Sequence, residues 1–179
     1  MTMRIRYSLV PLLPTAEGIR ILFTRRSTTL PQHQGQVAFP GGRCHADEVD
    51  AEITALREAE EEIGLHPADV RLLGRLDDIE TMASRFRITP VVGVAPYPYD
   101  WRACPREVDT IFTVPVADLM TPGAEREELW DFDGRKIPIR SFPVAGQVIW
   151  GATHRITRNL LDALGRAEAA ASPCDAGVG

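Results

Sequence analysis

The order of apolar and polar residues along the chain predicts short strands through most of its length. Residues 3–12 and 19–26 form two apolar runs separated by Thr-Ala-Glu-Gly, which is typical of a turn, so we expect two strands joined there. Pro90 stands in a third run and cannot donate a ladder hydrogen bond, so we expect it at a strand edge or bulge. Further predicted strands cover 70–79, 87–95, 109–116 and 147–150.

Two segments carry the spacing of amphipathic helices. Apolar residues recur along one face from Ala51 to Ile63, with Asp50 placed to cap the start and Gly64 placed to end the helix. A second helix is predicted after the strand at 147–150, because apolar residues again recur there at helical spacing: Ile156, Leu160, Leu161 and Leu164. Polar residues predict a loop over 27–36 and a hairpin with a turn over 122–136.

This mixture of strands and helices predicts an α/β or α+β fold. The 179 residues, 44% of them hydrophobic, are enough for one globular domain with its own core. We expect that domain to span 1–166 and the alanine-rich end, 167–179, to be a flexible tail.

Composition narrows the classes of partner. The formal net charge of −5 gives no overall basic footprint for nucleic acid or an anionic membrane, so neither partner is predicted. No apolar run approaches the roughly 20 residues of a membrane span. Arg4 and Arg6 precede an apolar run, faintly like a signal peptide, but Pro11 and Pro14 interrupt it and favour a strand.

The cysteines suit a reducing compartment. Cys44, Cys104 and Cys174 are odd in number and scattered, without a Cys-x-x-Cys pair, which argues against a disulfide framework or a structural zinc site. A cytoplasmic location is therefore expected.

A dense run of carboxylates occupies the end of the predicted helix 51–63. Each helical residue advances by about 100°, so Glu58, Glu61 and Glu62 fall on one stripe while Glu60 projects to the far side. The neighbouring arc is apolar and should face the core: Ala55, Leu56, Ala59 and Ile63.

This stripe is either a solvated helix face or a site for a cation. Two carboxylates about 4 Å apart repel by roughly 4 kcal/mol at an effective dielectric near 20. From 51 to 65 the only base is Arg57, one turn before Glu61 and able to orient it. Oxygen ligands alone favour a hard ion, Mg²⁺ or Mn²⁺, and Gly41-Gly42 just upstream would let backbone approach its ligand closely.

The segment from Arg57 to Leu65 resembles the second half of the Nudix box, Arg-Glu-apolar-x-Glu-Glu-x-Gly-apolar, at every position. The first half departs from the pattern, because the loop between Gly42 and Arg57 is one residue longer and places Gly42 and Glu48 one position early. The resemblance implies the Nudix fold, a mixed β-sheet sandwiched between α-helices, and metal-dependent hydrolysis of a diphosphate linked to another moiety.

The resemblance also implies roles for the box residues. The implied metal ligands are Glu58, Glu62 and Glu61, and the implied catalytic residues are Glu61, Glu58 and Arg57. One of these carboxylates, or one outside the box, must accept the proton of the attacking water. Asp77, Asp78 and Glu80 at a predicted strand end are a further candidate for a second metal or a base.

Residues 21–42 resemble the signature of the coenzyme A pyrophosphatase branch of the Nudix family. The matching positions are Leu22, Thr24, Ser27, Gly35, Phe39, Pro40, Gly41 and Gly42, with Arg26 just before Ser27. Phe23 stands where the signature has Leu, and Pro31 where it has Arg. The implied reaction is cleavage of coenzyme A, or an acyl form, into 3′,5′-ADP and 4′-phosphopantetheine or its acyl form. Candidate substrate-binding residues are Arg26, Ser27, His33, Gly35, Phe39, Gly41 and Gly42.

Two details of this assignment concern single residues. Arg25 and Arg26 alternate on a predicted strand, so only one can face the site; the signature favours Arg26, as a ligand for the 3′-phosphate of coenzyme A. Two roles are open for His33: a contact with the substrate, or a structural role in its own loop. Structural or surface roles are expected for His45, His66, His154 and Trp150.

Rival functions remain open. Within the family, the chain could act on another nucleoside diphosphate derivative, such as ADP-ribose, or on a nucleoside triphosphate. Residues 80–83, Glu-Thr-Met-Ala, lack the Pro or Tyr typical of ADP-ribose and dinucleoside-polyphosphate enzymes. A non-catalytic Nudix-fold binding module usually loses box carboxylates, which this chain retains. The expected partner is a small molecule, and a homodimer is left open.

Overall fold

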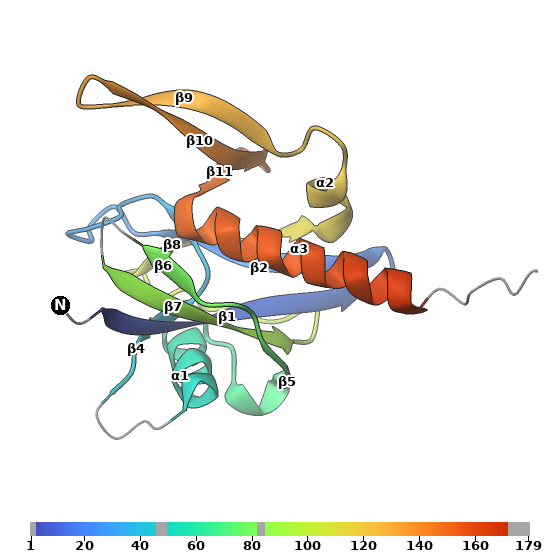
Figure 1. Ribbon diagram of the computed structural model, residues 1–179. Coiled ribbons are helices and arrows are strands. Elements are labelled where there is room, and N and C mark those ends of the chain that lie inside the picture. Colours follow the sequence, from blue (N-terminus) through green and yellow to red (C-terminus); the bar gives the residue numbers. More distant parts are fainter. Residues whose placement is uncertain (1–2, 46–49, 82–84, 172–179) are drawn as a thin grey trace, which may run out of the picture.

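The computed structural model describes residues 3–45, 50–81 and 85–171 (Figure 1). Its centre is an eight-stranded mixed sheet with the path β3-β2-β1-β7-β5, on which β4 pairs with β1, β6 with β7 and β8 with β2. The strands of this sheet are β1 (Arg4–Thr15), β2 (Gly18–Arg26), β3 (Val37–Ala38), β4 (Gly41–Arg43), β5 (Arg71–Arg75), β6 (Ile79–Thr81), β7 (Phe86–Val94) and β8 (Val108–Pro115).

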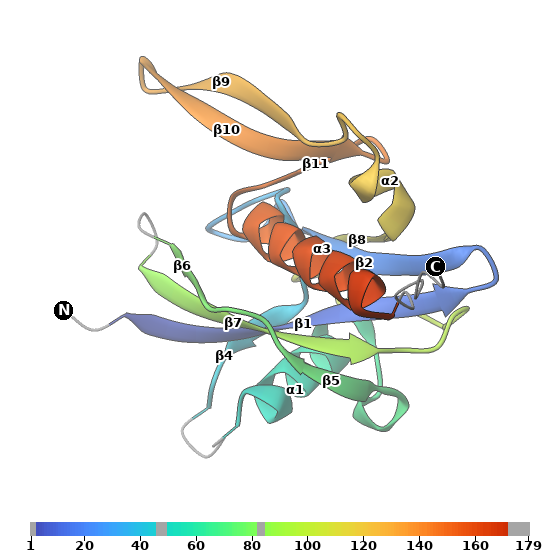
Figure 2. The same cartoon turned by 45° about the vertical axis from the view of Figure 1, so that its right-hand side comes forward.

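Helices cover both faces of this sheet. Figures 1 and 2 show α1 on one side of β1 and β7 and α3 on the other, with a separate three-stranded sheet beyond α3. The mixed sheet between helices that the sequence predicts is confirmed. The remaining elements are α1 (Ala51–Ile63), the 3₁₀ turn η1 (Pro67–Asp69), α2 (Val116–Met120), β9 (Arg126–Phe132), β10 (Arg135–Val144), β11 (Gln147–Trp150) and α3 (Gly151–Ala171).

The central strands are buried on both faces, which explains their nearly continuous apolar sequence. Along β1, Leu9 and Leu13 pack on the α1 side, whereas Val10 and Leu12 pack on the α3 side. Side chains of a strand alternate between its faces, so one strand supplies two cores. The apolar run that faintly suggests a signal peptide therefore forms the middle strand of the sheet.

The predicted boundaries of α1 are correct, but one cap works differently. Gly64 adopts a left-handed conformation, with φ of 70°, and its N–H donates to the carbonyls of Ala59 and Glu60, as expected for a C-cap. Asp50 occupies the N-cap position without a side-chain bond to the helix. Its carboxylate instead accepts a hydrogen bond of 2.6 Å from Arg75 on β5. The predicted capping role of Asp50 is thus wrong.

Other differences lie at strand ends. The predicted strand 70–79 is divided into β5 and the start of β6, and Pro90 lies buried inside β7 rather than at an edge. Pro90 lies between the segment of β7 that pairs with β6 and the segment that pairs with β5. The strand pairing on that side of β7 is interrupted there, so a residue without an N–H is tolerated. The polar hairpin predicted over 122–136 is longer and joins β11 as its own sheet. α3 continues to Ala171, into the predicted tail, whereas 172–179 lie outside the described residues.

Candidate active site

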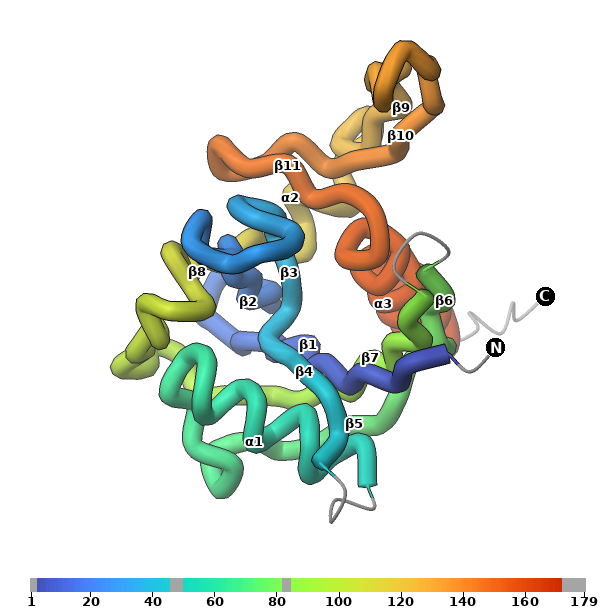
Figure 3. The backbone as a smooth tube through the Cα atoms, turned by 90° about the vertical axis from the view of Figure 1, so that its left-hand side faces the viewer, coloured from blue at the N-terminus to red at the C-terminus, as the bar shows by residue number. Residues whose placement is uncertain are grey.

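The Pro-Gly-Gly turn brings backbone directly onto the acidic end of α1. Figure 3 follows the chain from β3 through β4, which crosses β1 and leads towards α1. A Cβ at Gly41 would lie 2.4 Å from the carbonyl oxygen of Tyr7, and one at Gly42 would lie 1.9 Å from Oε1 of Glu58. At Gly41 the close atoms belong to backbone, so only glycine fits there, whereas at Gly42 a larger residue would displace the Glu58 carboxylate, which lies directly against the turn.

Glu62 is the most deeply buried carboxylate of the helix. Its side chain lies beneath the turn, where Oε2 accepts a hydrogen bond of 3.3 Å from the N–H of Gly41, and the residue is 4% exposed. Burial raises the pKa of Glu62 to about 8, and the negative charges of Glu107 and Glu58 add to the effect, while Arg26 opposes it. Without a cation the Glu62 carboxyl therefore favours its protonated form at neutral pH.

Glu58 lies one turn earlier and is partly shielded. Burial raises its pKa, while the Arg57 guanidinium, which donates to Oε1 at 2.9 Å, opposes that shift. Arg57 also donates to the Arg43 carbonyl at 3.1 Å, so it ties the helix to the end of β4.

Glu61 is placed differently from Glu58 and Glu62. It accepts a 3.0 Å hydrogen bond from Arg57, which confirms the predicted contact, but its side chain is 53% exposed. In the described part of the chain no three acidic, histidine or cysteine side chains gather closely enough to form a ready metal cluster. The expected convergence of three carboxylates is therefore wrong in this conformation, and the roles of the three stay predictions.

Two residues at the site were missed by the sequence reasoning. Glu107 begins the chain into β8; its carbonyl accepts from the N–H of Ser27 at 2.9 Å, and its charge acts on both Glu58 and Glu62. Arg6, on β1, donates to the carbonyl of Gly41 at 3.1 Å. Both lie far from the box in sequence, Arg6 on β1 and Glu107 just before β8, and no local motif marks them.

The predicted substrate loop, 27–36, leaves β2 beside this site. Ser27 is buried, and its hydroxyl bonds with that of Thr29 at 2.8 Å, which shapes the start of the loop. His33 is exposed, with its ring bonded to Gln36 at 3.0 Å, and Gly35 has a φ of 65° that favours glycine. Phe39 packs in the core against Phe23, with ring centroids 4.9 Å apart, so it anchors the turn.

Other candidates have structural partners. Asp78 accepts a 2.6 Å hydrogen bond from Thr89, and Glu80 accepts one of 3.0 Å from Arg87, so this acidic pair is already compensated. His154 is buried, as a structural role requires, and bonds with Glu125 at 2.9 Å. Further structural contacts involve Trp150, which lies 5.2 Å from the Trp130 ring, and His66, which accepts from the Ala68 N–H in η1. Glu48 lies outside the described residues.

The residues present fit a divalent cation. Glu58 and Glu62 place carboxylate oxygens, which could serve as ligands, on the same side of the helix and against the glycine turn. Glu62 makes no ion pair with any described residue, although Arg26 and Arg6 are electrostatic neighbours. Mg²⁺ keeps several waters and needs only one or two protein carboxylates, so this pair is sufficient. Either Mg²⁺ or Mn²⁺ would replace the missing positive partner.

Comparison with known proteins defines the family. The NUDIX domain model matches residues 4–135, and the chain belongs to this family. It is 39% identical over 103 residues to "Uncharacterized Nudix hydrolase NudL" from Salmonella paratyphi B, a match that covers 58% of this chain and 53% of the relative. The chain thus spans about half the length of the curated relatives it matches.

Solved structures agree on the fold alone. The M. smegmatis Nudix hydrolase RenU superposes with a TM-score of 0.61 at 16% identity, over 97% of this chain and 90% of that one. A C. elegans Ap4A hydrolase superposes with a TM-score of 0.55 at 18% identity, over 65% of this chain and 83% of that one. Among the described residues, no helix is both long and apolar enough to cross a membrane.

Proposed function

We propose that this protein hydrolyses the diphosphate bond of a nucleotide derivative, with coenzyme A or its acyl forms as the substrate. The observation that carries the proposal is the pair of shielded carboxylates, Glu58 and Glu62, held against the Gly41-Gly42 turn. Glu58 is paired with Arg57, but Glu62 is buried without an ion pair to any described residue, which is costly, so a site that retains it is best explained by a cationic ligand.

Each side chain has a distinct part in this proposal. Glu58 and Glu62 would hold Mg²⁺ or Mn²⁺, which would supply positive charge to the phosphoryl oxygens and make an attacking water more acidic. Arg57 holds Glu58 and Glu61 in place through hydrogen bonds of 2.9 and 3.0 Å. A water oxygen attacks one phosphorus, the bridging P–O bond breaks, and a carboxylate takes the proton. The candidates for that acceptor are Glu61, which is exposed to solvent, and Glu107, which directly precedes β8 and whose charge acts on Glu62.

The choice of coenzyme A rests on the signature that leads into the turn. Ser27 and Gly35 shape the loop, Phe39 anchors it, and Gly41 and Gly42 contact the carboxylates, so these five matched positions have physical roles in the loop and the turn. This arrangement supports the proposal that the signature loop recognises the substrate next to the turn. Pro31, where the signature has Arg, removes one cation from the loop.

A substrate panel tests the proposal. We expect turnover with Mg²⁺ or Mn²⁺ to give the highest kcat/KM on coenzyme A or acetyl-coenzyme A, with lower values on ADP-ribose and NADH. A clear preference for ADP-ribose or a nucleoside triphosphate would overturn the substrate assignment. Absence of turnover on every diphosphate, together with unaltered ligand binding, would instead favour a binding module.

A further inference from the structure

One buried polar atom in the active site has no partner. Nε of Arg26 is inaccessible to solvent and makes no hydrogen bond to any described residue, the only side-chain nitrogen or oxygen in that position within the described ranges. Buried donors in native proteins are nearly always satisfied, so an orphaned donor calls for an explanation such as an absent ligand.

The end of β2 separates Arg26 from its neighbour Arg25. The pairing with β8 shifts in register between these two residues, and such irregularities redirect side chains. Nε of Arg25 donates to Asp109 at 2.8 Å, in an ion pair exposed to solvent. Arg26 instead lies close enough to Glu62 to act on its charge. One arginine is therefore a surface residue and the other belongs to the site.

A second arginine joins Arg26 from β1. Arg6 donates to the carbonyl of Gly41, and both the Arg26 guanidinium and the carboxylates of Glu58 and Glu62 act electrostatically on it. Among the described residues, neither arginine forms an ion pair with those carboxylates. Two guanidinium groups beside the candidate cation site, with Nε of Arg26 left without a partner among the described residues, match the needs of an anion that the cation also binds.

We propose that Arg26, assisted by Arg6, binds the scissile diphosphate itself rather than the 3′-phosphate of the substrate. This inference rests on the proposed function, since it assigns the part of the substrate that this site contacts. The diphosphate must lie beside the ion held by Glu58 and Glu62, and Arg26 is their neighbour. The 3′-phosphate is several bonds away on the ribose, so this proposal differs from the expectation drawn from the sequence signature, which assigns Arg26 to that phosphate.

The direct test measures binding of methylenediphosphonate, whose CH₂ bridge cannot be hydrolysed. Calorimetric titration in Mg²⁺ would compare the full chain with Arg26→Ala and with the matched variant Arg25→Ala. We expect Arg26→Ala to bind about 10- to 100-fold more weakly, as loss of a charge-assisted contact predicts, and Arg25→Ala to bind as the parent does. Unchanged binding by Arg26→Ala, equal weakening by both variants, or no binding by the parent chain would overturn the inference.

Kinetics on two substrates separates the two phosphates. Arg26→Ala should lower kcat/KM equally on coenzyme A and on dephospho-coenzyme A, which lacks the 3′-phosphate. A loss confined to coenzyme A would restore the 3′-phosphate assignment. If neither compound is a substrate, the proposed function fails in its substrate, while the methylenediphosphonate titration still decides the role of Arg26.

Folding provides the last control. Because Nε of Arg26 has no hydrogen-bond partner among the described residues, the substitution Arg26→Ala should not lower the melting temperature. If alanine leaves a void, Arg26→Met is the second variant, since methionine keeps a buried apolar stem. Loss of diphosphonate binding by a stably folded Arg26→Met supports a ligand contact. Unfolding of both variants would contradict the view that this guanidinium has no structural partner.

Discussion

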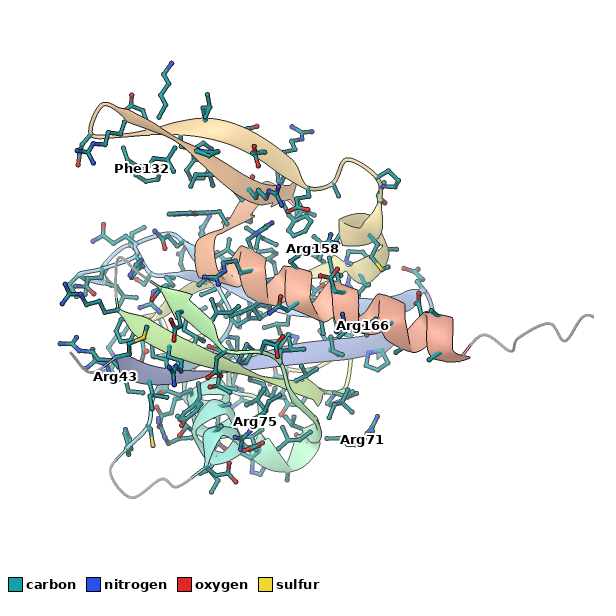
Figure 4. All side chains as sticks on the ribbon, viewed as in Figure 1. Arg43, Arg71, Arg75, Phe132, Arg158 and Arg166 are labelled. Carbon is teal, nitrogen blue, oxygen red and sulfur yellow. The ribbon has the colours of Figure 1, made fainter. Side chains whose placement is uncertain are left out.

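The two ends of α1 carry the same kind of side chain in opposite electrostatic states. At the first turn, Glu52 and the preceding Asp50 are both bound by Arg75, labelled in Figure 4. That guanidinium lowers the pKa of Glu52 to about 2, whereas burial raises the pKa of Glu62, in the last turn, to about 8. A buried acidic residue is a candidate for function when no cationic side chain is paired with it. The number of acidic residues in a stretch of sequence does not show which of them lack such a partner.

The dipole of α1 stabilises a negative charge at its N-terminal end and destabilises one at its C-terminal end. The N-terminus of a helix attracts negative charge and the C-terminus repels it, by about 0.3–1 kcal/mol for an exposed group. Glu52 therefore has a favourable dipole, a guanidinium and solvent, whereas Glu62 has an unfavourable dipole, burial and other acids nearby. A cation held at the second end would remove this difference.

The largest expected effect of a substitution at either end of α1 is the loss of turnover when Glu62 is changed. Glu62→Gln keeps the shape of the side chain but removes its charge, so kcat should fall about 10²- to 10³-fold, the usual loss for a group that holds transition-state charge. Steady-state kinetics of the diphosphate reaction measures it, and excess EDTA should abolish turnover in the parent chain.

The matched control is Glu52→Gln, an isosteric change at the other end of the same helix. Its kcat should stay within about twofold of the parent, since Arg75 and Asp50 remain on the surface and away from the turn. Equal losses in both variants would mean that the acids act only through the stability of α1.

The next effect is on stability as a function of pH. In metal-free protein, the Glu62 pKa of about 8 lies above the unfolded value of 4.5, so the native state binds the extra proton. The contribution of Glu62 to stability is therefore highest below pH 4.5 and falls as pH rises through 8, by on the order of 5 kcal/mol in total. Urea unfolding in EDTA at several pH values should show this slope in the parent chain and lack it in Glu62→Gln. A parent chain without the slope would refute the burial argument.

The smallest expected effect is on stability when Glu52, at the N-terminal end of α1, is changed. Glu52 has a lowered pKa, so its contribution is present above pH 4.5 and is lost as pH falls towards 2. Because the pair with Arg75 is near the surface, Glu52→Gln should cost no more than about 1 kcal/mol at pH 7. Urea unfolding at pH 7 and pH 3.5 should show a difference that shrinks at the lower pH; a larger loss would indicate that Arg75 organises the start of α1.

Much of this helix could be predicted because its determinants are local. The 3.6-residue period identifies Ala55, Ala59 and Ile63 as core residues, and all three are fully buried. Gly64 ends the helix through its own backbone conformation. In contrast, Asp50 looks like a cap, and only the position of β5 shows that Arg75 takes its carboxylate instead.

The rest of the site depends on contacts between distant segments. Arg6 and Glu107 come from β1 and the start of β8, and the pairing that brings them to α1 is not encoded by any local pattern. The same limit applies to the fold, since a polar composition predicts the β9–β10 hairpin but not its pairing with β11. The predicted stripe of three carboxylates fails at Glu61, whose side chain is 53% exposed although Arg57 donates to both Glu58 and Glu61.

The most direct test of the central claim is the melting temperature with and without Mg²⁺. Binding to the native state alone raises stability by RT ln(1 + [L]/Kd), so Mg²⁺ should raise the melting temperature of the parent chain and of Glu52→Gln. It should have little effect on Glu62→Gln, which lacks the buried charge. In metal-free buffer, Glu58→Gln should be as stable as the parent or more so, since one repelling charge is removed. A shift of equal size in Glu62→Gln, or no shift in the parent chain, would contradict a metal site at the end of α1.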